Sequence, residues 1–231
     1  MDTAEKTNWS FVIITFMVIV FLIGYGKNLG NQVYNQTDDN NAECVGYVLK
    51  NKNIIPLPVL GDENAPLLIE VYSDYQCPFA SRYYIEDIRL VIKDYINTGK
   101  ARLVYRELAF EGERSEWAAE AARCANDQGK FWEFHDKIFQ DRYSAENTDI
   151  YEKDNLKKIA QSLGLDVCEF NQCLDSDKYV SLIKEETQNN LDQRINGTPT
   201  TFLNGVRMVN EEGESWGALP YEDLTRILNK Y

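Results

Sequence analysis

This 231-residue chain lacks several features that mark common binding sites. It has no GxxxxGK(S/T) or GxGxxG segment, so we predict no nucleotide-binding loop. Basic residues are also few: 24 lysines and arginines stand against 37 acidic residues, which gives a formal net charge of −13. Because nucleic-acid binding needs clustered lysine and arginine, this charge argues against a nucleic-acid partner.

Metal ligands are scarce as well. The one histidine, His135, lies in KFWEFHDKIF, where a partly buried polar residue of a helix is the simpler interpretation. The cysteines contain no CxxC pair, which structural zinc sites commonly use. We therefore predict no metal and no cofactor. The five cysteines are Cys44, Cys77, Cys124, Cys168 and Cys173.

One long apolar run lies near the N-terminus. The chain carries no charge from Thr7 to Gly26, and as a helix rising about 1.5 Å per residue this run matches a bilayer core of about 30 Å. A cleaved signal peptide and a buried core helix are the alternatives, but no A-x-A-like site follows. We predict a single-pass membrane anchor at residues 1–28, whose orientation the flanking Lys6 and Lys27 leave open.

A polar linker is predicted at residues 29–58, where asparagine, glutamine and aspartate are abundant and prolines stiffen the end. Cys44 lies in it, and we interpret it as incidental rather than as a free or intermolecularly paired thiol. The remaining residues, 59–231, are enough for one medium domain with its own core.

The domain begins with a strand-helix-strand pattern. The segment 65–73, APLLIEVYS, is apolar on nearly every residue, as is typical of a buried strand. Apolar residues then recur at helical spacing over 78–97, and Gly99 provides a C-terminal stop. The segment 101–110 is a second strand. Such a βαβ unit predicts parallel strands joined by a right-handed crossover.

Helices are predicted to fill an insert at about 112–195. After it, 198–209 indicates a hairpin, because Asn204-Gly205 between two β-prone runs is a strong turn signal. An amphipathic helix at 219–231 follows. The order βαβ, helical insert, ββα predicts an α/β protein with a thioredoxin fold and a helical insertion.

A single cysteine stands where the first strand gives way to the first helix. Cys77 precedes Pro78, which suits the first position of a helix. The sulfur would then face unpaired backbone N–H groups and the positive end of the helix dipole. Since these stabilise the nucleophilic thiolate, we expect a pKa below the free value of about 8.5. A buried cysteine that caps the helix by chance is the alternative.

A second part of this site is predicted far along the chain. Pro199 stands just before a strand, and the sequence does not distinguish a cis from a trans peptide bond there. A cis bond would leave the backbone groups of Thr198 available to pair with an extended peptide beside Cys77.

Four segments together resemble the DsbA-like, thioredoxin-fold disulfide oxidoreductases, in particular their membrane-tethered or secreted bacterial and archaeal branch. The segments are YSDYQCPFASRYY, AAEAARCANDQGKFWEFHDKIF, LGLDVCEFNQCLDSDKY and GTPTTFLNG. The resemblance runs from about residue 58 to the C-terminus. It implies an enzyme outside the cytoplasm that exchanges disulfides with unfolded client proteins through the first cysteine of a C-P-x-C motif.

The resemblance also implies roles for single residues. Cys77 matches the nucleophile, Pro78 and Phe79 match the dipeptide that tunes it, and Thr198 with Pro199 match the cis-proline loop.

Three further positions follow from the same resemblance. Glu70 matches, with an offset of one residue, a buried acidic residue behind the site that can relay a proton. A solvated glutamate is the alternative. A structural disulfide between Cys124 and Cys173 is implied, which leaves Cys168 as a spare small apolar residue and fits an oxidising compartment.

The sequence departs from the family at Ala80, where the second active-site cysteine should stand. Thiol exchange passes through a mixed disulfide that a second thiol resolves, so without that thiol the intermediate persists. We favour a Cys-to-Ala trap form of an ordinary oxidoreductase with a CPFC site, and a natural monothiol relative is the alternative.

Three functions follow from these observations. The first is a membrane-anchored, extracytoplasmic thiol-disulfide oxidoreductase, whose complete form would pass electrons from client proteins to a quinone-linked membrane partner. The second is a monothiol enzyme that uses glutathione as the resolving thiol, similar to monothiol glutaredoxins or kappa-class glutathione transferases. The third is a tethered peptide-binding domain without enzymatic turnover.

Overall fold

The computed structural model describes residue 44 and residues 56–144, 149–209, 213 and 218–231. The predicted anchor at 1–28 and most of the predicted linker lie outside the described residues. Within the described part of the chain, no helix is long and apolar enough to cross a membrane.

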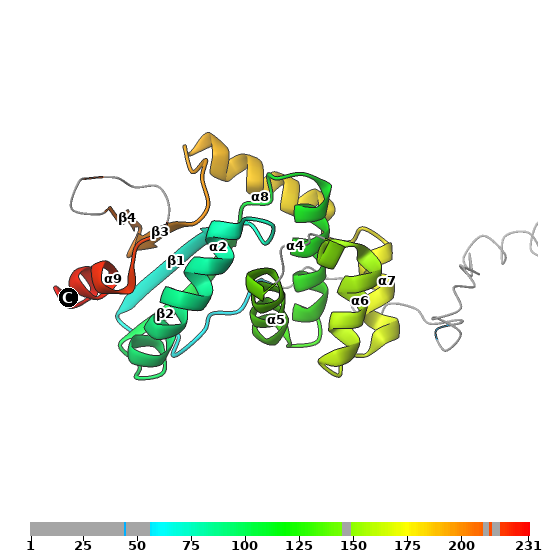
Figure 1. The fold of residues 1–231 in the computed structure, drawn as a ribbon, viewed down its shortest axis with the longest axis horizontal. Helices are drawn as coiled ribbons and strands as arrows, with labels where there is room; N and C mark the ends of the chain where they lie inside the picture. The colour runs from blue at the N-terminus through cyan, green and yellow to red at the C-terminus, as the bar shows by residue number, and fades with distance from the viewer. Residues whose placement is uncertain (1–43, 45–55, 145–148, 210–212, 214–217) are drawn as a thin grey trace, which may run out of the picture. The chain divides into compact units, whose positions relative to one another are not determined.

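A four-stranded sheet forms the centre of the domain (Figure 1). Its order is β2-β1-β3-β4. β1 and β2 are parallel, and β3 is antiparallel to both β1 and β4. The parallel pair and the hairpin are therefore both confirmed. The strands are β1 (Leu67–Ser73), β2 (Ala101–Glu107), β3 (Thr200–Leu203) and β4 (Val206–Arg207).

The hairpin turn also fastens β3 to the central strand. Asn204 and Gly205 both have positive φ, 49° and 78°, as a tight hairpin turn between twisted strands requires. Leu68 in β1 donates its N–H to Asn204 Oδ1 and accepts the Asn204 N–H, each at 2.8 Å.

The helix predicted at 78–97 runs from Pro78 to Ile96 in four consecutive segments, two of them π-helical. Its buried side chains include Tyr84, Ile88 and Val91, as the helical spacing predicts. The segments are α2 (Pro78–Tyr83), η2 (Tyr84–Ile88), α3 (Arg89–Val91) and η3 (Ile92–Ile96).

The insert is helical, as predicted, and Figure 1 shows α4 to α7 gathered beside the sheet. The Asp166 side chain caps α7 by accepting the Glu169 N–H at 3.0 Å. The insert contains α4 (Glu113–Asn126), α5 (Phe131–Ser144), η4 (Asp149–Tyr151), α6 (Lys153–Ser162), α7 (Val167–Asp175) and α8 (Val180–Asp192), and the final helix is α9 (Tyr221–Leu228).

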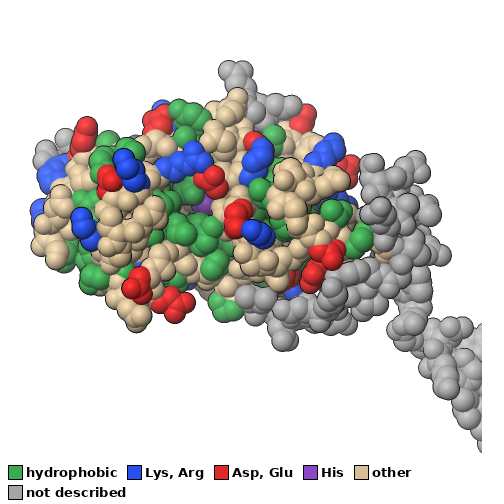
Figure 2. Space-filling model, turned by 90° about the horizontal axis from the view of Figure 1, so that it is seen from below, with side chains coloured by type: hydrophobic (Ala, Val, Ile, Leu, Met, Phe, Trp, Pro, Cys, Tyr) green, Lys and Arg blue, Asp and Glu red, His purple; other side chains and the backbone are tan. Residues whose placement is uncertain are grey.

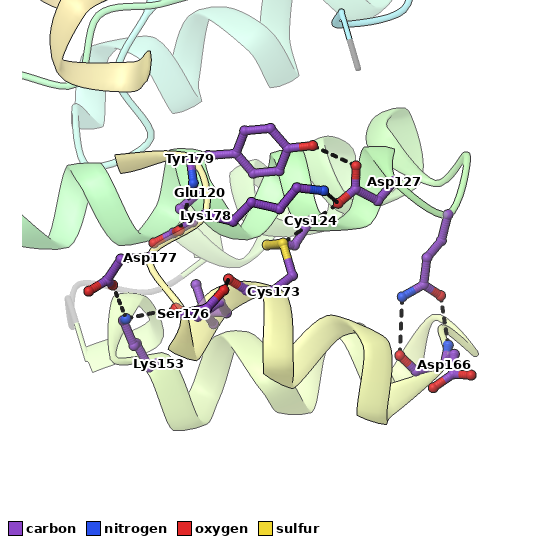
Figure 3. Close-up of a disulfide and its surroundings, with 12 residues drawn as sticks. Glu120, Cys124, Asp127, Lys153, Asp166, Cys173, Ser176, Asp177, Lys178 and Tyr179 are labelled. Atoms are coloured by element: carbon purple, nitrogen blue, oxygen red, sulfur yellow. Dashed lines mark hydrogen bonds and ion pairs between the residues drawn. A yellow bond between two sulfur atoms is a disulfide. The ribbon is translucent and has the colours of Figure 1, made fainter. Parts of the chain in front are cut away.

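A disulfide joins α4 to α7 through Cys124 and Cys173, the pairing that the family resemblance implies (Figure 3). Both cysteines are 1% exposed. Beside them, Asp127 accepts hydrogen bonds from Lys178 Nζ at 2.7 Å and from Tyr179 Oη at 2.5 Å. The Cys124–Cys173 disulfide is therefore buried inside the insert, next to the buried ion pair between Lys178 and Asp127.

The interpretation of the other two cysteines needs correction. Cys44 and Cys168 are each disulfide-bonded, so Cys44 is not incidental and Cys168 is not a spare apolar residue. The family resemblance implied only the Cys124–Cys173 bond, and it carried no information about a bond made by Cys168, which is five residues from Cys173 and so lies on a different face of α7.

The surface combines charges of both signs. Figure 2 shows acidic and basic side chains interspersed over one face, with apolar side chains between them. On this face, the net negative charge of the chain does not gather into a single acidic patch.

One buried carboxyl group of the insert should make stability depend on pH. Glu120 in α4 has no exposed surface, and burial raises its pKa to about 7. One carboxylate oxygen accepts the Tyr179 N–H at 3.1 Å, while the other has no hydrogen-bond partner among the described residues. Because the folded-state pKa lies above that of an unfolded glutamate, folding favours the protonated form.

We therefore expect Glu120 to stabilise the fold most below about pH 4.5, with this contribution lost as the pH rises through about 7. The loss should be about 3 kcal/mol in the free energy of unfolding. Urea unfolding at several pH values should show it in the native protein and not in Glu120→Gln. Glu113→Gln, which changes an exposed glutamate of the same helix, is the control. Parallel pH curves for the native protein and Glu120→Gln would contradict this prediction.

Candidate active site

Cys77 lies between the end of β1 and the start of α2. Its backbone is extended, with φ −64° and ψ 117°, and Pro78 is the first residue of the helix, as predicted. Cys77 is only 4% exposed, whereas the neighbouring Phe79 is 58% exposed. A buried sulfur thus adjoins an exposed aromatic ring.

The cis-proline loop meets this cysteine, although the two segments are 121 residues apart in the sequence. The peptide bond between Thr198 and Pro199 is cis. The Cys77 thiol donates a hydrogen bond to the Thr198 carbonyl oxygen, with Sγ and O 3.4 Å apart. The structure therefore brings together Cys77, Thr198 and Pro199, as the sequence predicts.

Ala80, at the position of the missing cysteine, is 1% exposed. Ala80 lines a small cavity, together with Ser73, Tyr105 and His135 among others. Most of the residues that line this cavity with Ala80 are apolar or aromatic.

His135 forms part of this cavity wall and is more deeply buried than we predicted, at 2% exposed. Its Nδ1 is hydrogen-bonded to Tyr75 Oη at 2.9 Å. Burial lowers its pKa to about 3, so the ring is neutral at physiological pH. The described residues contain no cluster of histidine, cysteine and acidic side chains suited to hold a metal.

The helical insert fixes the loop before Cys77 through the two preceding carbonyl groups. The Tyr151 hydroxyl donates to the Tyr75 carbonyl, and Arg142 Nε donates to the Gln76 carbonyl at 3.1 Å. The insert therefore helps to define the position of the sulfur.

Asp74 organises the site, and the sequence analysis did not identify it. This carboxylate is 1% exposed and accepts four hydrogen bonds. They come from Gln76 N at 2.8 Å, Ser115 Oγ at 2.7 Å, Phe110 N at 3.1 Å and Glu111 N at 3.2 Å. Asp74 thus ties the loop before Cys77 to the segment after β2. Burial raises its pKa, and the four hydrogen bonds oppose this effect.

Glu111 is a second acidic residue that the sequence analysis missed. Burial raises the pKa of Glu111, and the charge of Asp74 adds to this rise. The charge of Glu111 in turn raises the pKa of Cys77. No local sequence pattern points to this pair, because its members follow different strands.

The expected acidification of Cys77 is not what the structure gives. Burial raises the pKa of the thiol, and this effect is the largest. The Thr198 side chain and the backbone N–H groups of Ala80 and Phe79 lower the pKa, and the Glu111 charge adds to the rise. The helix N-terminus acts in the predicted direction, but the net shift is upward because the sulfur is buried.

The expected place of Glu70 also needs correction. Its carboxylate accepts hydrogen bonds from Arg106, with Nη2 and Oε1 2.7 Å apart. Successive side chains of a strand point to opposite faces of the sheet, so Glu70 faces away from Val71 and Ser73, which line the cavity behind Ala80. The one-residue offset from the family position therefore reverses the face. Glu111 and Asp74, not Glu70, are the carboxylates at the site.

Residues 55–230 match the family model described as thioredoxin. The chain belongs to the thioredoxin family. A relative within this family, disulfide bond formation protein D of Bacillus subtilis (strain 168), is 26% identical over 174 residues, which cover 74% of this chain and 76% of the relative.

Solved structures agree with this thioredoxin-family assignment. Oxidised BdbD from Bacillus subtilis has a TM-score of 0.66 and 24% identity, covering 75% of this chain and 91% of BdbD. A thioredoxin-like oxidoreductase from Silicibacter pomeroyi DSS-3 has a TM-score of 0.59 and 26% identity, covering 75% and 90% of the two chains. The predicted thioredoxin fold with a helical insertion is confirmed, as is the relationship to thiol:disulfide oxidoreductases.

Proposed function

We propose that this protein is an extracytoplasmic, membrane-anchored thiol-disulfide oxidoreductase that reacts with client proteins through Cys77. In the Ala80 form, it holds each client as a mixed disulfide. The observation that carries the proposal is the contact between the Cys77 thiol and the Thr198 carbonyl, which joins a helix-start cysteine to a cis-proline loop.

The reaction is a thiol-disulfide exchange. The Cys77 thiolate attacks one sulfur of a client disulfide, the client S–S bond breaks, and the departing client thiolate takes a proton. An extended client segment pairs with the backbone of Thr198 while this happens. Phe79 and Phe110, 58% and 41% exposed, offer apolar surface for the client.

The location and the redox partner follow from the same proposal. The Cys124–Cys173 disulfide supports an oxidising compartment, since such bonds persist outside the cytoplasm. The uncharged run at residues 7–26 supports a single-pass anchor. A form with cysteine in place of Ala80 would oxidise clients and pass the electrons to a quinone-linked membrane partner.

The proposal predicts that the native protein forms a stable adduct with a peptide disulfide. Incubation with a symmetric disulfide-linked peptide dimer should attach one peptide to Cys77 and release the other as a free thiol. Intact-mass spectrometry should show one peptide per chain, which remains attached after free peptide is removed. Cys77→Ser should form no adduct.

Two other results of the peptide experiment would contradict the proposal. Equal labelling of the native protein and Cys77→Ser would show that Cys77 is not the reacting group. Repeated release of the peptide by glutathione, with turnover, would favour the glutathione-dependent monothiol enzyme.

Peptide binding without chemistry is the second candidate, because the raised pKa of Cys77 reduces the thiolate fraction at neutral pH. In that case, peptide binding persists in Cys77→Ser and the native protein forms no adduct.

A further inference from the structure

The backbone at the end of β2 is bonded on two sides. β2 is an edge strand, because the strand order is β2-β1-β3-β4. On the side of β1, Leu108 donates its N–H to the Ser73 carbonyl at 3.0 Å. Successive peptide groups of an extended chain point in opposite directions, so the groups of Glu107 and Ala109 point away from β1. At an open sheet edge they would have no partner in the sheet.

Two side chains of α8 bind these edge groups. Asn190 Nδ2 donates to the Glu107 carbonyl oxygen at 2.9 Å, and Thr187 Oγ1 accepts the Ala109 N–H at 3.1 Å. Thr187 and Asn190 are three residues apart and therefore lie on one face of the helix. Thr187 is also buried. This face of α8 thus covers the edge of β2.

A buried ion pair joins the same two elements. Arg123 of α4 donates to Glu107 Oε2 at 2.6 Å and to Glu186 Oε2 at 2.5 Å. Glu186 is the residue of α8 that precedes Thr187. The side chains of Arg123 and Glu107 are 3% and 1% exposed. Charged and neutral contacts therefore fix α8 against the end of β2.

The end of α8 directs the chain toward the cis-proline loop. Arg194 has a positive φ of 64°, and its N–H donates to the Leu191 carbonyl at 2.9 Å. The next N–H, of Ile195, donates to the Asn190 carbonyl at 3.0 Å. These two bonds around a left-handed residue form a Schellman motif, which ends the helix. Thr198 follows three residues after Ile195.

The cis-proline loop is consequently held at both ends. After the proline, Thr200 of β3 pairs with Tyr72 of β1. Before the proline, the chain is held through the docking of α8 on β2. Between these ends, the Thr198 carbonyl accepts the hydrogen bond of the Cys77 thiol. Because β2 is bonded to β1, which leads to Cys77, a shift of α8 would move Thr198 relative to the sulfur.

We propose that Asn190 is a positioning residue for client binding and that Thr187 shares this role. Asn190 bonds the edge of β2 with its side chain and the start of the cis-proline loop with its carbonyl, so it holds the Thr198 backbone where an extended client segment pairs with it. The inference rests on the proposed thiol-disulfide exchange. Asn190 acts through the loop and not on the sulfur, so it affects the reaction with a client and not the reactivity of the thiol.

The test compares two disulfides that react with Cys77 of the full protein. One is a symmetric disulfide-linked peptide dimer, and the other is hydroxyethyl disulfide. In both cases the Cys77 thiolate forms a mixed disulfide with one half, and the other half leaves as a thiol, so the chemistry is the same. Only the peptide is long enough to pair with the backbone of Thr198. Intact-mass spectrometry gives the rate of each reaction over a range of concentrations.

Asn190→Leu should lower the rate with the peptide by at least about 10-fold relative to the rate with hydroxyethyl disulfide, because a small shift of the binding backbone weakens client alignment. The half-saturating peptide concentration should rise. The rate with hydroxyethyl disulfide should equal that of the native protein. Thr187→Val should act in the same direction, whereas Thr187→Ser, which keeps the hydroxyl group, should behave as the native protein does.

Asn189→Leu is the matched control, because it makes the same change one residue earlier, at an exposed position of α8. It should leave both rates unchanged. Equal slowing of both disulfides in Asn190→Leu would overturn the inference, since Asn190 would then act on the thiol. Circular dichroism checks that each variant is folded, and if Asn190→Leu does not fold, Thr187→Val against Thr187→Ser decides.

Failure of this inference is distinguishable from failure of the proposed function. If the native protein forms no adduct with either disulfide, the proposed exchange is rejected and the inference is rejected with it. If both adducts form and folded Asn190→Leu and Thr187→Val keep the native rate with the peptide, the positioning role is rejected and the exchange is retained.

Discussion

Ala80→Cys is expected to convert a protein that stops at a mixed disulfide into one that turns over. The new thiol would stand three residues after Cys77, in the first turn of α2, where it attacks the mixed disulfide within the same molecule. Intramolecular attack gains a large effective concentration over attack by a thiol in solution. We expect oxidation of a reduced client to be at least about 100-fold faster than with the Ala80 form.

The change at Ala80 is small. Ala80 is one of the residues that line a small cavity, and Ala80→Cys adds a single sulfur atom at this buried position. The assay would follow loss of client thiols, with oxidised glutathione present to regenerate the enzyme disulfide. Each cycle then moves two electrons from the client to glutathione.

Two variants make the result interpretable. Ala80→Ser adds an atom at the same place without a thiol, and Cys77→Ser combined with Ala80→Cys has the second thiol without the first. Neither should accelerate oxidation. If folded Ala80→Cys is no faster than Ala80→Ser, the oxidoreductase proposal fails and peptide binding without chemistry takes its place.

The fold was predictable because the sequence patterns that indicate its strands, helices and turns are local. The apolar run of β1, the helical spacing after Pro78 and the Asn204-Gly205 turn each depend on a few neighbouring residues. The helix-start position of Cys77 is local as well, and the family resemblance added the distant proline loop.

The acidic residues of the site were not predictable for the opposite reason. The charge of Glu111 acts on Cys77 because two parallel strands end at one edge and because Asp74 accepts N–H groups from residues 36 and 37 positions away. The face of Glu70 depends on a single residue of register, which the motif did not fix. The sign of the Cys77 pKa shift depends on burial, which only the assembled fold determines.

Removal of the Cys124–Cys173 disulfide should have the largest effect on stability. The bond closes a loop with a sequence separation of 49, for which the chain-entropy model gives about 4 kcal/mol of stabilisation. We expect the double variant Cys124→Ala with Cys173→Ala to lose about this much in denaturant unfolding, and its melting temperature to fall by roughly 10 °C.

The same variant separates the role of the insert in stability from its role at the site. The lost bond joins α4 to α7, whereas the contacts that hold the loop before Cys77 come from Tyr151, Arg142 and Ser115. In the folded double variant, the pH profile of Cys77 alkylation should therefore equal that of the native protein. A stability loss below about 1 kcal/mol would mean that native packing, including the buried Asp127–Lys178 pair, already holds the two helices together without the covalent bond.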